Sequence, residues 1–143
     1  MIVALYPRGC GINFYGKREA DFLRNTVNLC AYTGKILANS EKSLEHVYPR
    51  SKMAGGDIWD IGNLMVTGKK ANTHRDDIPF KIFLMKNPEA IENIVKYLNK
   101  YKNLEINGIK YVQRLMRTLN REAVGVVRFE TGGNGIIFAR KNH

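Results

Sequence analysis

The chain has 143 residues, 44% of them hydrophobic, and 23 lysines and arginines against 13 aspartates and glutamates, a formal net charge of +10. This length predicts one domain with enough apolar material for a packed core, and no apolar run reaches the length of a membrane-spanning helix. The start of the chain lacks the pattern of a secretion signal, and two cysteines are too few for a disulfide framework. We therefore expect neither a membrane protein nor a disulfide-rich secreted domain. We expect a protein of a reducing, cytoplasmic setting.

The positive charge lies on both sides of a neutral centre. Residues 1–43 carry six basic against three acidic side chains, residues 44–77 carry five against five, and residues 78–143 carry twelve against five. Such an excess favours a polyanionic partner, either nucleic acid or an acidic membrane face. A basic surround for phosphates, with acids for a metal ion in the centre, is what a nuclease needs. The alternative is that the basic faces are simply solvated.

The first half of the chain predicts short elements separated by turns. Apolar residues at near-helical spacing predict a short helix over 18–29, and Thr33-Gly34 predicts a hairpin turn between two apolar pieces. Residues 43–48 are strand-like. Residues 51–62 predict a loop, with adjacent glycines and a tryptophan that we expect to fix it to the core.

The second half predicts helices and a final hairpin. The predicted elements are, in order, an extended run over 63–67, one or two helical turns over 68–77 ended by Pro79, a helix opening at Asn87-Pro88 and reaching Leu98, a turn at Asn107-Gly108, a helix over 109–122, and a β-hairpin in which VGVVRFE and GIIFARK flank TGGN. Together with the first half, these elements predict an α+β fold.

The later of the two long helices carries a basic stripe. Lys110, Arg114, Arg117 and Arg121 are spaced four, three and four residues apart, so they share one helix face. No acid interrupts the stripe before Glu122, which favours contact with a DNA backbone over an ordinary solvated face. The hairpin that follows has two interpretations, a groove reader or an element that closes a small sheet.

Polar residues that suit phosphodiester chemistry gather in the neutral centre. A lone histidine in a strand is usually structural, but His46 has Glu45 beside it, with Asn63, Asn72 and His74 downstream. A neutral imidazole near its reference pKa can take a proton from water. Successive strand residues point to opposite faces, so the carboxylate and the imidazole share a site only if the strand twists or a backbone group helps.

The stretch from about Cys30 to Pro79 resembles the HNH, or ββα-metal, nuclease superfamily. The matching motifs follow in a specific order: Glu45-His46, Pro49-Arg50, Gly55-Gly56-Asp57, Asn63-Leu64, and Lys69-Lys70-Ala71-Asn72. The resemblance implies a ββα-metal nuclease core over residues 30–80, with flanking helices. Residues 1–29 would form an N-terminal segment and helix that pack on this core. Residues 81–143 would form a basic helical and β-hairpin extension in the same compact domain.

The resemblance also implies a role for each polar residue. His46 would be the general base, Glu45 and Asn72 the ligands of Mg²⁺ or Mn²⁺, and Asn63 a catalytic residue that joins the loop to the strand and so orients the histidine. Nucleic-acid contacts are expected from a larger basic set: Arg50, Lys69, Lys70, His74, Arg75, Lys110, Arg114, Arg117 and Arg121.

Two of these arginines have an alternative role. A guanidinium can grip two phosphate oxygens at once, which suits Arg50 and Arg75 as phosphate clamps. Surface salt bridges with Asp76 or Asp77 are the alternative for both.

The sequence departs from the family pattern in two places. Many members carry histidine where Asn72 stands, so this chain is a His-Asn-Asn variant, and His74 is offset by two residues, about 200° on a helix. Many members also hold structural zinc with two CxxC pairs, whereas the matching places here retain only Cys30. No structural zinc is therefore expected, and packing of Tyr32 and Leu29 would replace it.

The sequence therefore predicts a metal-dependent HNH endonuclease that hydrolyses phosphodiester bonds in DNA, by nicking or by double-strand cleavage. Small members of this kind occur in phages and mobile elements, which would place the chain in a host cytoplasm. One metal site cuts one strand per encounter, so double-strand cleavage would call for a homodimer or a second binding event. Two other hypotheses stay open: a catalytically inactive basic DNA- or RNA-binding protein on the same fold, and a structural or interaction protein of a phage particle or host-takeover complex.

Overall fold

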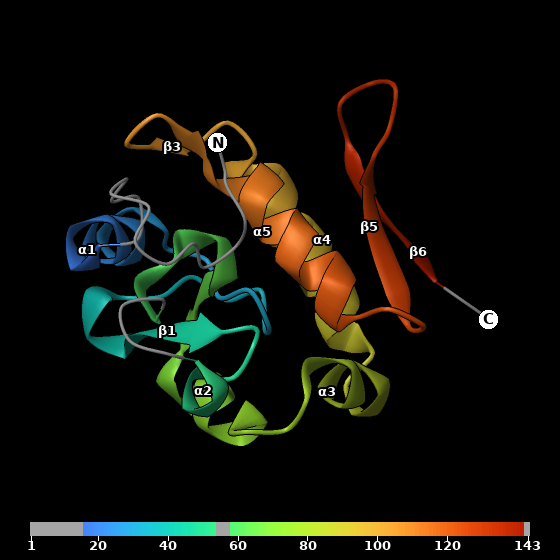
Figure 1. The fold of residues 1–143 in the computed structure, drawn as a ribbon, viewed down its shortest axis with the longest axis horizontal. Coiled ribbons are helices and arrows are strands. Elements are labelled where there is room, and N and C mark those ends of the chain that lie inside the picture. The colour runs from blue at the N-terminus through green and yellow to red at the C-terminus, as the bar shows by residue number, and fades with distance from the viewer. Residues whose placement is uncertain (1–15, 54–57, 142–143) are drawn as a thin grey trace.

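The computed structural model describes residues 16–53 and 58–141, and it has a mixed α+β fold (Figure 1). The helices of these residues are α1 Lys17–Thr26, α2 Lys69–Arg75, α3 Phe80–Lys86, α4 Glu89–Tyr101 and α5 Tyr111–Glu122. The strands are β1 Lys42–His46, β2 Leu64–Gly68, β3 Glu105–Ile106, β4 Ile109–Lys110, β5 Val127–Thr131 and β6 Ile137–Lys141. The strands pair as three small antiparallel sheets of two strands each, which confirms the predicted α+β class.

One cluster of buried apolar side chains joins the parts of the fold. It draws on α1, β2, α3, α4, α5 and the β5–β6 hairpin. In Figure 1, α5 crosses the middle of the molecule with α4 beside it. The β1–β2 pair lies on one side of α5 and the β5–β6 hairpin on the other. None of the described helices combines the length and the apolarity of a membrane span.

The β1–β2 pair positions α2 against the end of β1. The two strands run antiparallel in register from Lys42 opposite Gly68 to His46 opposite Leu64. α2 begins directly after β2 and contacts both strands. Residues at the carboxyl end of β1 therefore lie next to residues of α2, although some 26 positions separate them in the sequence.

A buried lysine fixes the beginning of β1 to the end of α1. Lys42 is 1% exposed, and its Nζ donates to the carbonyl oxygen of Arg24 at 2.9 Å and to Oδ1 of Asn28 at 2.7 Å. A cation at the carboxyl end of a helix is favoured by the helix dipole. Burial lowers the pKa of the lysine, and its two acceptors offset the cost of that burial.

Two tyrosine hydroxyls cover the free edge of β2. The N–H of Val66 donates to Tyr97 Oη at 3.0 Å, the two hydroxyls of Tyr97 and Tyr111 lie 2.7 Å apart, and Tyr111 donates to the carbonyl oxygen of Leu64 at 2.7 Å. Both tyrosines are fully buried. The relay satisfies backbone groups of β2 that a third strand would otherwise have to satisfy.

Replacing Tyr97 with phenylalanine is expected to lower the free energy of unfolding by about 1–3 kcal/mol, because it leaves the N–H of Val66 buried without an acceptor. Tyr101→Phe is the control: its hydroxyl accepts from the N–H of Asn28 at an exposed position, where water can replace it. Urea denaturation of both variants measures the difference. Equal losses would contradict a special role for the relay.

Two asparagines fasten the β5–β6 hairpin to the helices. Asn120 of α5 pairs with both backbone groups of Phe129, at 2.7 and 3.0 Å, and Asn99 of α4 pairs in the same way with Ile137, at 2.9 and 2.8 Å. Each side-chain amide thus stands where a neighbouring strand would be. Val127, Phe129 and Ile137 are buried.

Most predicted elements are present, with three differences. α3 was not predicted, although Phe80, Phe83 and Leu84 are buried at helical spacing. The turn at Thr33-Gly34 forms, but it closes only a single bridge between Leu29 and Ile36. α2 ends at Arg75, before Pro79, because Asp76 adopts a positive φ of 50°.

Candidate functional site

An open cleft of about 420 Å³ lies between the carboxyl half of β1 and α2. Its polar lining includes Ser43, Glu45, His46, Arg50, Asn72 and Asp76. The fold therefore brings three of the four predicted centre residues to one cleft. The fourth, Asn63, is fully buried in the 3₁₀ turn just before β2.

The imidazole of His46 is held by a backbone carbonyl. Its Nε2 lies 2.9 Å from the carbonyl oxygen of Ile58. Because a carbonyl only accepts, Nε2 carries the proton and the lone pair lies on Nδ1. Burial lowers the pKa of His46; the hydrogen bond to Ile58 opposes that shift, and the neighbouring charges of Arg50 and Arg75 add to it, so the pKa lies below its ordinary value. The ring is therefore neutral at pH 7 and fixed in one tautomer, as a general base requires.

Glu45 is bound on its buried side by two donors. It is 3% exposed, and its Oε2 accepts from Tyr32 Oη at 2.5 Å and from Arg75 Nη1 at 2.6 Å. Burial raises the pKa of Tyr32 well above its ordinary value, so the phenol stays protonated and donates. Burial also raises the pKa of the Glu45 carboxyl, and the charge of Arg75 opposes that shift. The carboxylate also contributes to the lining of the cleft.

Arg75 is buried, whereas the sequence predicted a surface arginine that contacts phosphate or pairs with a neighbouring aspartate. It is 1% exposed, which is too buried to grip a phosphate, and its carboxylate partner is Glu45 instead of Asp76 or Asp77. Both predicted roles are therefore wrong. The remaining guanidinium hydrogen bonds reach backbone carbonyls: Nε to Ile78 at 2.7 Å, Nη1 to His46 at 2.9 Å and Nη2 to Val47 at 2.9 Å. Arg75 thus fastens the last turn of α2 to the end of β1.

The two asparagines hold different parts of the site. Asn72 Nδ2 donates to Ser43 Oγ at 2.6 Å and to the carbonyl oxygen of Leu44 at 3.3 Å. These two bonds fix the orientation of the amide, with the nitrogen toward β1 and Oδ1 as the atom that can accept. Asn63 pairs with both backbone groups of Tyr48, at 2.7 and 3.0 Å. The two hydrogen bonds between Asn63 and Tyr48 fix the chain two residues after His46.

The basic residues around the cleft are exposed. Arg50 lines the cleft itself. Lys69 and Lys70 lie in the first turn of α2, and His74 lies in its last turn with its ring 6.3 Å from that of Phe83. These side chains are available to a ligand that extends beyond the cleft.

The predicted stripe on α5 is interrupted. Arg117 and Arg121 are exposed, and Lys110 is exposed just before the helix. Arg114 is half-buried against the 3₁₀ turn at Gly62. The approach is close: a Cβ added to Gly62 would lie only 3.2 Å from the Cβ of Arg114. The Nε of Arg121 also forms an ion pair with Glu122 at 2.8 Å. The stripe therefore offers fewer free cations than its spacing predicts.

The sequence missed several polar residues of the site. Asp76, Asp77 and Ser43 line the cleft, and Tyr32 lies behind it on Glu45. Asp76 could have been found, since it follows Asn72 by four positions, one turn of a helix. No sequence signal indicates Tyr32, which lies 13 positions from its partner.

The lining of the cleft fits a hard divalent cation better than zinc. Its oxygen donors are the carboxylates of Glu45, Asp76 and Asp77 and the amide of Asn72, which are ligands that Mg²⁺ and Mn²⁺ prefer. In the part of the chain that the structure describes, no group of three or more His, Cys, Asp and Glu side chains is placed to hold a metal ion. A site here would therefore combine the amide of Asn72 with one or two carboxylates and water.

Hydrogen bonds surround Cys30. This buried thiol accepts from the N–H of Gly68 at 3.2 Å. The backbone of Ala31 donates to Val66 at 3.0 Å and the carbonyl of Tyr32 accepts from Asn93 at 2.8 Å. Cys10 lies outside the described residues, as do Gly55, Gly56 and Asp57 of the resemblance.

Comparisons with protein-family models, with curated proteins and with solved structures found no match to this chain.

Proposed function

We propose that this chain is a metal-dependent endonuclease of the HNH type, which hydrolyses phosphodiester bonds in DNA. The observation that carries the proposal is the cleft in which a neutral, oriented imidazole lies beside the oxygen donors of Glu45 and Asn72. The order of β1, β2 and α2, with the cleft between strand and helix, supports a ββα-metal core. The net charge of +10 supports a polyanionic substrate.

The residues of the cleft divide the chemistry between them. His46 Nδ1 takes a proton from a water molecule whose oxygen attacks the phosphorus. The bond from phosphorus to the 3′ oxygen breaks and that oxygen takes a proton from solvent water, which leaves a 5′-phosphate and a 3′-hydroxyl, as the resemblance implies. Mg²⁺ held by Glu45 and Asn72 would supply charge stabilisation at the phosphate. The carbonyl of Ile58 keeps the base in its working tautomer.

A basic path leads away from the cleft along α2. The cleft and a shallow pocket beside it share Thr73, and that pocket shares Lys69 and Lys70 with a third, which also includes Lys35. The three hollows are therefore neighbours along α2. Phosphates on one side of the scissile bond would follow this path, and Arg50 would contact the scissile region from the rim of the cleft.

The proposal is tested with supercoiled plasmid DNA. The protein is expected to nick the plasmid in Mg²⁺ or Mn²⁺, to stop in EDTA and to recover when metal is restored. Asn72→Ala is expected to lower cleavage at limiting Mg²⁺ and to recover partly at high Mg²⁺, because it removes a ligand and leaves the base. Asn103→Ala, which removes an exposed asparagine outside the lining of the cleft, is the control. Cleavage that persists in EDTA would remove the metal from the mechanism.

One observation favours a second function, that of a basic DNA- or RNA-binding protein without catalysis. Arg75 already compensates the charge of Glu45, and Tyr32 donates a hydrogen bond to it. The carboxylate is therefore stabilised in the absence of a metal ion. The same plasmid experiment separates the two functions. DNA binding in EDTA without any metal-dependent nicking would favour the binding protein.

A further inference from the structure

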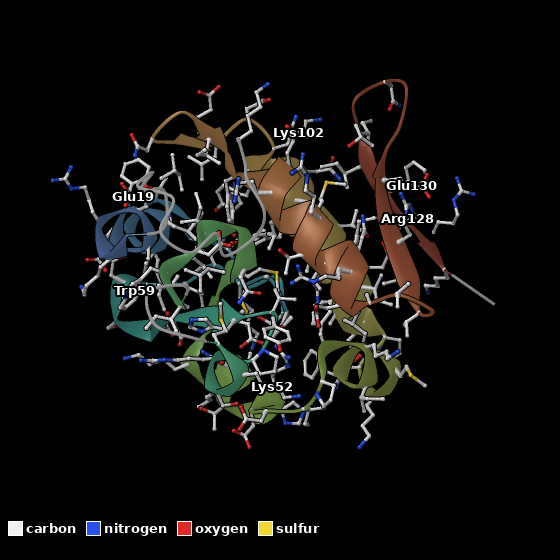
Figure 2. All side chains as sticks on the ribbon, viewed as in Figure 1. Glu19, Lys52, Trp59, Lys102, Arg128 and Glu130 are labelled. Atoms are coloured by element: carbon white, nitrogen blue, oxygen red, sulfur yellow. The ribbon has the colours of Figure 1, made fainter. Side chains whose placement is uncertain are left out.

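The β5–β6 hairpin has one face that the rest of the fold leaves open. The hairpin forms a sheet of its own, and Val127, Phe129 and Ile137 face the helices and are buried. Side chains alternate along a strand, so the intervening residues point to solvent. Figure 2 shows Arg128 and Glu130 on the hairpin at its outer side, away from α5.

This open face is basic and already ordered. Arg128 and Arg140 face each other across the two strands and are 65% and 61% exposed. Glu130 lies between them, with its Oε2 2.8 Å from Arg140 Nε and 3.8 Å from Arg128 Nε. The guanidinium of Arg140 also lies 5.6 Å from the centre of the Phe138 ring. Like charges directly across a strand pair cost stability, so the fold gains nothing from a second arginine there.

The arrangement has the features of a phosphate contact. Arg128 and Arg140 give the face two exposed cations against one carboxylate. Stacking on the Phe138 ring restricts the Arg140 guanidinium, which lowers the entropy lost when it binds a phosphate. A two-stranded ribbon is also narrow enough to lie along a groove of duplex DNA.

We infer that the outer face of the β5–β6 hairpin is a second DNA-contacting surface, in which Arg128 and Arg140 engage backbone phosphates of duplex DNA away from the cleft. This inference deepens the proposed function by assigning a second part of its substrate contact. The hairpin would hold duplex that flanks the cleaved site, so it raises affinity without taking part in the chemistry.

The experiment measures binding of the full chain to a fluorescent duplex in EDTA, over a series of salt concentrations. The double variant Arg128→Gln/Arg140→Gln is expected to weaken binding about tenfold or more near 0.1 M salt. The slope of log K against log salt is expected to fall by about two, one unit for each lost phosphate contact. The control variant Lys81→Gln/Lys86→Gln removes the same charge from exposed positions on α3.

A second variant is expected to change DNA affinity in the opposite direction. Arg140 lowers the pKa of the Glu130 carboxyl, which is therefore ionised at neutral pH. Glu130→Gln removes the only acid from the face and is expected to strengthen duplex binding a few-fold, with a steeper salt dependence. A merely structural role for the hairpin would weaken binding in both variants, so the pair of signs separates the two explanations.

Three results would overturn the inference. The arginine variant could bind duplex as well as the α3 control, Glu130→Gln could bind more weakly, or the loss could be confined to a single-stranded probe. None of these results bears on cleavage, because the assay contains no metal. Plasmid nicking by the arginine variant is expected to fall at limiting DNA and to recover as the DNA concentration rises, since the contact adds affinity alone.

Discussion

Replacement of His46 by alanine is expected to lower metal-dependent cleavage of plasmid DNA by about 10²–10⁴-fold, because the variant lacks a general base. Binding of duplex DNA in EDTA is expected to stay unchanged, since the ring of His46 carries no charge at pH 7. Its Nε2 hydrogen bond to Ile58 is lost, so thermal unfolding of the variant must be checked as well. Cleavage by His46→Ala at the rate of the unaltered protein would remove this residue from the mechanism.

The control for His46 is the other described histidine. His74 lies on the exposed side of α2 and has only a ring contact with Phe83. His74→Ala is expected to weaken DNA binding slightly at most and to leave the cleavage rate at saturating DNA intact. A large loss of rate in His74→Ala, with His46→Ala unaffected, would exchange the two roles.

The pH dependence of cleavage gives an independent check on the base. Burial holds the pKa of His46 below the ordinary imidazole value, and the base is active only when it is deprotonated. The rate is therefore expected to be constant above neutral pH and to fall as pH drops through this lowered pKa. A midpoint above about 6.5 on the acidic side of the rate profile would show that another group titrates.

The sequence predicted the elements that local patterns determine. Apolar spacing was enough for α1, α4 and α5, and alternation with a glycine-rich turn was enough for the β5–β6 hairpin. α3 was not predicted, because a helix of only seven residues with three buried apolar side chains is too short to establish a helical period. Short helices depend on tertiary packing more than on propensity.

The sequence could not predict which polar residues the fold would bury. Arg75 lies in the last turn of a short polar helix, where an arginine is usually exposed, and only tertiary structure places Glu45 and Tyr32 against it. Arg114 shows the same limit, because the missing Cβ of Gly62 lets α5 approach closely enough to half-bury it. Helical spacing identifies a shared face of α5 but says nothing about what covers that face.

Replacing Arg75 with methionine is expected to lower the free energy of unfolding by about 3–5 kcal/mol, the usual effect of removing one member of a buried ion pair. The variant leaves the Glu45 carboxylate buried with Tyr32 as a donor, and it frees three backbone carbonyls at the end of β1 and after α2. Urea denaturation measures the loss. Arg50→Met, at an exposed position beside the cleft, is the control and is expected to cost less than about 0.5 kcal/mol.

A double-mutant cycle separates the ion pair from the backbone contacts of Arg75. Glu45→Gln leaves the guanidinium buried without a counter-charge, so it is also expected to destabilise the protein, while the double variant with Arg75→Met should cost less than the sum of the two. The difference measures the coupling, expected to be about 1–3 kcal/mol. Additive losses would instead assign the stability of Arg75 to its carbonyl contacts. If Arg75→Met still cleaves DNA, and the double variant folds and binds DNA but does not cleave it, the negative charge of Glu45 serves the chemistry of the cleft.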